Sequence, residues 1–310
     1  SYTNQFNDYP KLGVWPDGYY ISYNIFNNGQ TFAGSKVCAF DRTAMLAGTA
    51  ATQQCFQLST SFGGLLPSDL DGASSTLGGQ GSTSSSGLPP AGSPNFFMNF
   101  GANSLNLWKF HVDFANSANT NFTGPTNIAV ATFSAACSGG GACIPQPGTS
   151  NKLDSLADRL MYRLAYRHFV DGHETLVVNH SVTVGTKRTG ITSVRWYEIR
   201  NPNGTPTVFQ QGTLGTADKI HRWMGSIAQD KNGDIALGYS ASSGSVFPSI
   251  RYTGRVPTDA LGTMQAENII LSGNFSQTGN LHRWGDYSAM SVDPVDDCTF
   301  WYTTEYIPAT

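Results

Sequence analysis

Charged side chains are scarce in this 310-residue sequence. Asp, Glu, Lys and Arg make up 13% of it, about half the usual share for a soluble globular domain. The formal net charge is −3, so we expect neither nucleic acid nor an anionic membrane surface as a partner. No run of 18 apolar residues occurs, and the sequence therefore predicts no membrane span. A signal peptide is absent, and the chain opens on Ser1 rather than Met, which indicates a processed or trimmed start.

Common catalytic and metal-binding motifs are also missing. The six histidines form no HExxH pattern, and the five cysteines contain no CxxC pair. No GxSxG, Walker or GxGxxG motif stands in the strand-to-helix context that its chemistry requires. Long helical stripes are absent as well, and LDSLADRL is expected to form only one or two helical turns.

Glycine, by contrast, is abundant, with 34 residues, and Ser, Thr and Asn are plentiful. This composition is typical of exported β proteins. Cys137 and Cys143 bracket the flexible segment SGGGA and are expected to close a small disulfide ring. Cys38 and Cys55 flank the helical-looking DRTAMLAG and would join two neighbouring strands, which leaves Cys298 over. We therefore predict a secreted or cell-surface protein; the alternative is five reduced thiols in the cytosol.

An internal repeat defines the predicted fold. HRWMGSIAQDKNGDIALGYSAS begins at His221, and the similar HRWGDYSAMSVDPVDDCTFWYTTEY begins at His282. Each has a polar and aromatic head, a short strand, an Asp-rich turn and a second strand. Weaker copies are NDYPKLGVWPDGYYISYNIF, LLPSDLDG and ADRLMYRLAYRHFVDGHETLVVNHSV, so that five heads fall near residues 8, 69, 158, 222 and 283.

This spacing, with about four strands per repeat, predicts an all-β protein, a single five-bladed β-propeller over 1–310. Segments 73–92 and 134–152 are expected to be low-complexity surface insertions, too rich in Gly and Ser to pack. The last blade lacks two strands. Residues 1–6 would supply a closing strand, or the natural chain continues and offers Cys298 a partner. The alternative fold is a β-sandwich whose turn chemistry recurs.

Several of these segments, RWGDYSAMSVDPVDDCTFWYTTEY, DYPKLGVWPDGYYISYN and DRLMYRLAYR, resemble a group of secreted bacterial proteins assigned to sialidase-like or BNR-type propellers. The resemblance implies a propeller fold and export. The Asp box of that group, S-x-D-x-G-x-T-W, has its nearest match at Gln229–Gly233, which lacks the Trp. This departure puts a sialidase assignment in doubt.

The five heads are the predicted site, because the first strands of propeller blades converge on the axis and ligand sites collect polar groups from several elements. Three heads carry an arginine: Arg159, Arg222 and Arg283. Converging guanidinium forks would bind an anionic group, as the arginine trio of sialidase-like enzymes does. The alternative is that each arginine pairs with a nearby Asp and locks adjacent blades.

Asp8 and Asp286 are candidate acid and base for cleavage of a glycosidic bond, and Tyr287 is a candidate nucleophile. Trp223 and Trp284 are candidates for stacking on sugar rings; the alternative is packing between blades. Clustered acids such as Asp69 and Asp71, or those of DPVDD at 293–297, would suit Ca²⁺, although Asp, Pro and Gly also form turns.

Three functions follow from these residues. The first is a propeller that binds a glycan or an extracellular protein at its axial mouth. The second is a sialidase-like hydrolase acting on an acidic glycan. The third is a structural module of a larger extracellular assembly.

Overall fold

Strands dominate the computed structural model, which describes residues 4–72, 87–186, 190–215 and 217–308. The helices are single turns: α1 (Arg42–Leu46), η2 (Ser117–Asn119) and η3 (Ala136–Ser138). Within these ranges, no helix has the length and apolar character needed to cross a membrane.

Apart from one short two-stranded sheet, the strands of the described ranges fall into successive antiparallel units. The first unit consists of β1 (Gln5–Val14), β2 (Gly18–Asn27), β3 (Thr31–Asp41) and β4 (Gln53–Gln57). The second consists of β5 (Leu66–Leu70), β6 (Asn95–Gly101), β7 (Ser104–His111) and β8 (Asn121–Ala129). The third consists of β11 (Met161–His168), β12 (Glu174–Val184), β13 (Ile191–Arg200) and β14 (Thr207–Thr213). The fourth consists of β15 (His221–Gln229), β16 (Ile235–Ser242), β17 (Ser249–Arg255) and β18 (Asn268–Leu271). The fifth contributes β19 (Ala289–Val292) and β20 (Phe300–Thr303).

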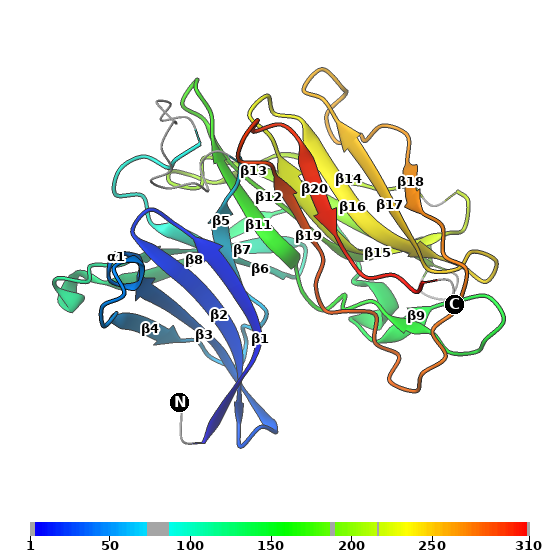
Figure 1. The fold of residues 1–310 in the computed structure, drawn as a ribbon, viewed down its shortest axis with the longest axis horizontal. Helices are drawn as coiled ribbons and strands as arrows, with labels where there is room; N and C mark the ends of the chain where they lie inside the picture. Colours follow the sequence, from blue (N-terminus) through cyan, green and yellow to red (C-terminus); the bar gives the residue numbers. More distant parts are fainter. Residues whose placement is uncertain (1–3, 73–86, 187–189, 216, 309–310) are drawn as a thin grey trace.

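The first strands of the units lie toward the middle of the molecule (Figure 1). β5 pairs with β11 in parallel, which joins the second and third units into one eight-stranded sheet. β1 lies against β5, and β15 lies against both β11 and β19. Curled antiparallel units whose first strands converge make this a propeller-like all-β fold.

Burial follows from this arrangement. β12 is buried along its first nine residues and β15 along its last eight, because these strands are covered on both faces by neighbouring units. β2, in the first unit, alternates instead between buried and partly exposed positions over its first half. Gly13 marks the closest approach of β1 to β5: a Cβ there would lie 2.4 Å from the Ser68 carbonyl oxygen.

A buried ion-pair network lies between the first strands of the units. We call it the axial network, and it consists of Arg163, Asp69 and Asp71. Arg163 of β11 donates to Asp69 Oδ2 at 2.6 Å and lies 3.2 Å from Asp71 Oδ1. The same guanidinium also donates to the Met290 carbonyl oxygen of β19 at 3.1 Å. Asp69 in turn accepts from the backbone N–H of Val14 at 2.8 Å. One buried cation therefore links the first strands of four units.

A bulge recurs in the first strands. In β1 the register shifts between Asp8 and Lys11, and Tyr9 has φ 52°. In β15 it shifts between Trp223 and Ser226, and Met224 has φ 53°. A left-handed residue within a bulge is uncommon for a bulky side chain. Its recurrence supports the repeat that was inferred from the sequence.

Several local predictions are confirmed. Disulfides join Cys38 to Cys55 and Cys137 to Cys143, and Cys298 is a free thiol. α1 forms inside DRTAMLAG, where Asp41 Oδ1 caps the helix by accepting from the Ala44 N–H at 3.0 Å.

Three predictions are wrong. LDSLADRL forms no helix, because Leu153 and Asp154 make strand β10 (Leu153–Asp154), which pairs with β9 (Ala142–Ile144). Gln5 and Phe6 pair with β2 and do not close the last unit. Segment 134–152 was expected to be too rich in Gly and Ser to pack, but it buries Ile144 and Gln146, although most of its residues stay exposed or partly exposed. Most of the other predicted insertion, 73–92, lies outside the described residues.

Candidate functional site

The heads of the first, third and fifth units come together at one end of the central strands. We call Tyr9, Lys11, Arg159, Asp286 and Tyr287 the mouth cluster. The rings of Tyr9 and Tyr287 stack with centroids 5.3 Å apart. The Tyr9 hydroxyl donates to the Asp286 carbonyl oxygen at 3.2 Å, and the Tyr287 hydroxyl donates to the Pro10 carbonyl oxygen at 3.3 Å.

Lys11 is the unusual member of the mouth cluster. Its side chain is buried, with Nζ 2.9 Å from the Tyr9 ring centroid and 3.8 Å from that of Tyr287. No carboxylate of the described residues lies within ion-pair distance of Nζ, whose hydrogen bond goes to the Pro10 carbonyl oxygen at 3.4 Å. Two aromatic faces therefore hold this amine, and when it is protonated they do so by cation–π contacts.

The pKa of Lys11 is lowered to about 6, first by burial and then by the nearby positive charge of Arg159, against the opposing effect of Asp286 and Asp8. Burial raises the pKa of the Tyr287 phenol, as do the negative charges of Asp286 and Asp8. The phenolate form is thus disfavoured, and the role of Tyr287 as a nucleophile stays a prediction.

Two of the three predicted arginines reach the mouth cluster. Arg159 grips Asp158 with two hydrogen bonds, at 2.7 and 2.8 Å, and its guanidinium lies 4.4 Å from the Tyr9 ring centroid. Arg283 is exposed and pairs with Asp286 Oδ2. The other carboxylate oxygen, Asp286 Oδ1, is buried and accepts no hydrogen bond from the described residues. A buried acceptor without a partner suits a ligand that brings a donor.

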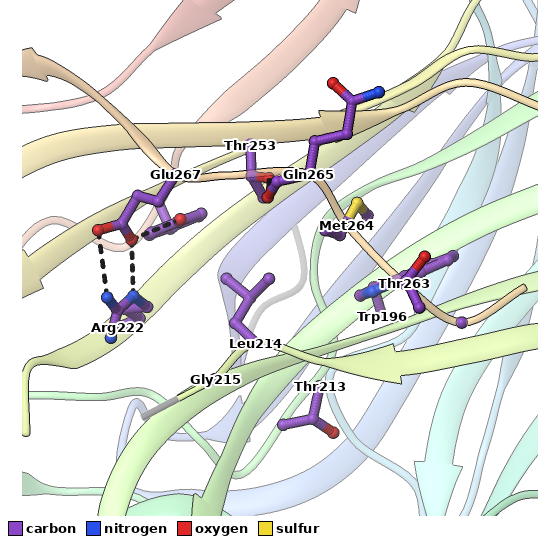
Figure 2. A pocket seen from close by; sticks show the side chains of 12 residues that line it. Trp196, Thr213, Leu214, Gly215, Arg222, Thr253, Thr263, Met264, Gln265 and Glu267 are labelled. Carbon is purple, nitrogen blue, oxygen red and sulfur yellow. Dashed lines mark hydrogen bonds and ion pairs between the residues drawn. The ribbon is translucent and has the colours of Figure 1, made fainter. Parts of the chain in front are cut away.

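The third arginine, Arg222, lies in a different place. It pairs with Asp218 and Glu267 and lines a cleft of about 350 Å³ between the third and fourth units. Figure 2 shows Arg222 and Glu267 facing each other beside Leu214. The predicted arginine trio is therefore not formed, because two carboxylates hold Arg222 toward β18.

Glu267 stays ionised in this cleft. Although burial acts to raise its pKa, hydrogen bonds from Arg222, Tyr239 and Arg251 lower it below the ordinary value. A carboxylate that accepts from three donors is suited to holding strands together rather than to giving up a proton. We therefore interpret the Arg222 cleft as a structural contact.

Trp223 and Trp284 are both buried and pack in a cluster with Met161, Ile144 and Leu153. Their centroids lie 6.1 Å apart, and Trp284 Nε1 donates to Ser240 Oγ at 2.9 Å. Neither ring presents a face to solvent, so the prediction that they stack on a sugar is wrong. The reason is that segment 134–152 folds over them.

The acidic residues considered as Ca²⁺ ligands make ion pairs with arginines or accept hydrogen bonds within turns. Asp69 and Asp71 contact Arg163, and Asp297 contacts Arg167. Asp293 and Asp296 accept hydrogen bonds within their own turn. Among the described residues, no three His, Cys, Asp or Glu side chains are grouped as metal ligands. Asp8 is exposed at the edge of the mouth cluster.

Sequence reasoning missed two residues, Lys11 and Glu305. Alternation along β1 places Lys11 on the same inward face as Tyr9 and Gly13. This alternation is the sequence pattern from which the burial of Lys11 could have been predicted. Glu305 lies near the Gly285 backbone, and burial together with Asp286 raises its pKa. Glu305 lies at the end of the repeat that begins at His282, away from the head in which site residues were sought.

No protein-family model matches the chain, and neither does any curated protein. Among solved structures, it is similar to a complex of BT0996 with RGII, with a TM-score of 0.45 and 10% identity over 98% of this chain and 88% of that one. A glycoside hydrolase gives a TM-score of 0.43 and 11% identity over the same shares. These similarities are too weak to assign an activity. The fold and the mouth cluster themselves describe a propeller-like protein with an aromatic and charged mouth.

Proposed function

We propose that this protein is a secreted five-bladed β-propeller that binds an acidic glycan at the mouth cluster. The observation behind the proposal is the Tyr287 ring, 43% exposed, stacked on buried Tyr9 beside the exposed guanidinium of Arg283. The two disulfides are the basis for proposing an oxidising, extracellular compartment.

Sugar chemistry fits such a surface. One face of a pyranose ring is made of C–H groups and can lie on an aromatic ring, while its hydroxyls need acceptors and donors around the edge. Asp286 Oδ1 supplies a buried acceptor without a partner. Arg283 can release Asp286 and take a sugar carboxylate in its fork, because its present pair is exposed and such pairs are worth only about 0–1 kcal/mol.

A glycan array with the intact protein and a Tyr287→Ala/Arg283→Ala double variant tests the proposal. We expect selective binding of acidic glycans by the wild type and a loss of at least tenfold in the double variant. Tyr252→Ala is the matched control, because Tyr252 is similarly exposed (41%) on β17. Failure of the folded wild type to bind any glycan would contradict the proposal and favour a protein partner or a scaffold role. Equal losses in Tyr252→Ala would also contradict it.

Glycoside hydrolysis is a second candidate function, favoured by one observation. Glu305 is exposed and lies near Gly285, and partial desolvation together with the charge of Asp286 raises its pKa, the direction that a general acid needs. If the protein cleaves a glycan that it binds, Glu305→Gln should abolish cleavage and leave binding intact. Cleavage that survives in Glu305→Gln would remove this candidate.

A further inference from the structure

A second cleft lies beside the head of the fourth unit and has a volume of about 680 Å³, within the range of small-ligand sites. One wall is the loop that the Cys137–Cys143 disulfide closes. Another wall consists of Thr183, near the end of β12, and Thr192, near the start of β13. His221, at the start of β15, also lines the cleft. None of these residues belongs to the mouth cluster.

The lining has one kind of chemistry. Among the described residues that line the cleft, two side chains are basic, Lys152 and His221, and none is Asp or Glu. Hydroxyl groups surround them, from Ser134, Ser138, Thr183 and Thr192. Basic and hydroxyl groups without a carboxylate are a donor set, so the cleft is suited to a group that brings acceptor oxygens and negative charge.

The hydrogen bonds of His221 fix which ring nitrogen can donate. Nδ1 accepts from the Thr192 backbone N–H at 3.2 Å, so the proton of the neutral ring is on Nε2. Nε2–H has no hydrogen-bond partner among the described residues. Burial, together with the positive charge of Lys152, lowers the pKa of His221 to about 4. Lys152 and His221 therefore line the same cleft, and no carboxylate of the described residues lines it with them.

Lys152 is exposed and makes no ion pair within the described part of the chain. Its backbone is fixed, since its carbonyl oxygen accepts from His282 Nδ1 at 3.0 Å and the adjacent Leu153 is buried. The opposite wall is also held in place, because Cys143 is disulfide-bonded and precedes buried Ile144. The donor groups of the cleft are therefore attached to backbone that hydrogen bonds, burial and a disulfide hold in place.

From these contacts we infer that this cleft binds the oxyanion of a charged sugar, a carboxylate or a sulfate ester, through Lys152 Nζ, His221 Nε2–H and the surrounding hydroxyls. This inference concerns a separate site and does not depend on the proposed function of the mouth cluster. The ligand oxygens would pair with the Lys152 ammonium and would accept a hydrogen bond from Nε2–H of the neutral His221 ring.

Calorimetric titration with glucuronate, glucose 6-sulfate and neutral glucose tests the inference. We expect one or both charged sugars to bind and glucose not to bind. Lys152→Gln should weaken binding about tenfold or more, the size expected for one charge-assisted hydrogen bond. Lys36→Gln, on β3, removes the same charge elsewhere and should leave the affinity unchanged.

A second measurement, on the wild type alone, keeps the test valid if the Lys152→Gln variant does not fold. The ring signals of His221 should shift in NMR spectra of the wild type on addition of the charged sugar, and glucose should leave them in place. Binding that is equal for glucose would overturn the inference, as would an unchanged affinity in Lys152→Gln or the absence of binding by both charged sugars. Tyr287→Ala should not alter this binding, so failure of the mouth proposal and failure of this one can be told apart.

Discussion

Two buried basic side chains define two different regions of this molecule. In the axial network, Arg163 contacts the carboxylates of Asp69 and Asp71 and two backbone carbonyl oxygens. In the mouth cluster, Lys11 is equally buried but lies between two tyrosine rings and has no carboxylate within ion-pair distance among the described residues. One region neutralises its basic group with anions, and the other does not.

The difference separates a structural role from a binding role. A buried arginine with all its donors engaged joins strands and has nothing left for a ligand. A buried lysine without an anion, beside an unpartnered carboxylate oxygen of Asp286, keeps polar groups that a ligand can satisfy. The predicted alternative was that each arginine of the heads pairs with a nearby Asp, and such pairs are present: Arg159 with Asp158, Arg222 with Asp218 and Arg283 with Asp286. The Arg–Asp contact that joins the first strands of different units is instead that of Arg163, which was not predicted.

The largest expected effect is on the axial network. Arg163→Met leaves two buried carboxylates without their cation and should lower the free energy of unfolding by about 3–5 kcal/mol. Urea unfolding measures this loss. Arg283→Met is the matched control, because its pair is exposed and should change stability by at most about 1 kcal/mol. Similar effects of the two variants would contradict the distinction between the two regions. If Arg163→Met does not fold, Arg163→Lys should show an intermediate loss.

The next effect is the pH dependence of stability due to Lys11. Its pKa is about 6 in the folded protein and near the ordinary 10.5 in the unfolded chain, so between these values unfolding takes up a proton. Stability contributed by this group therefore rises with pH, by up to about 1.4 kcal/mol per pH unit. Lys11→Met removes the contribution, so its advantage over the wild type should shrink from pH 7 to about pH 9. A constant difference between the two proteins in urea unfolding at each pH would contradict this prediction.

The smallest effect concerns Arg159. Arg159→Gln removes a cation–π contact with Tyr9 and should cost only about 0.5–1 kcal/mol of stability in thermal unfolding. Because the positive charge of Arg159 helps to lower the pKa of Lys11, the same variant should raise that pKa. Arg42→Gln is a suitable control, since Arg42 also lies over a tyrosine ring but in the first unit near α1. An unchanged Lys11 pKa in Arg159→Gln would show that Arg159 does not act on Lys11.

The architecture was largely predictable because a repeated strand–turn–strand pattern depends on local alternation and turn residues. The heads near 69 and 222 lie in β5 and β15, and the predicted missing strands correspond to the two-stranded fifth unit. The site was less predictable. The repeat pointed to Tyr287 and Asp286, which lie together in the mouth cluster, but it gave equal weight to Arg222, whose partner Glu267 lies 45 residues further along the chain. Burial of Trp223 and Trp284 also depends on a distant segment, the loop that contains Ile144, and no local pattern reports such packing.

Measuring the pKa of Lys11 directly tests the central claim, that the mouth cluster holds a buried amine which no anion of the protein neutralises. Lysine side-chain NMR signals of the wild type, followed from pH 5 to pH 11 and assigned with Lys11→Met, provide the measurement. We predict one lysine that titrates near pH 6 and is lost in the variant. A Lys11 that titrates near 10.5 would contradict the claim, because it would mean that a carboxylate such as Asp286 neutralises the ammonium as Asp69 neutralises Arg163 in the axial network.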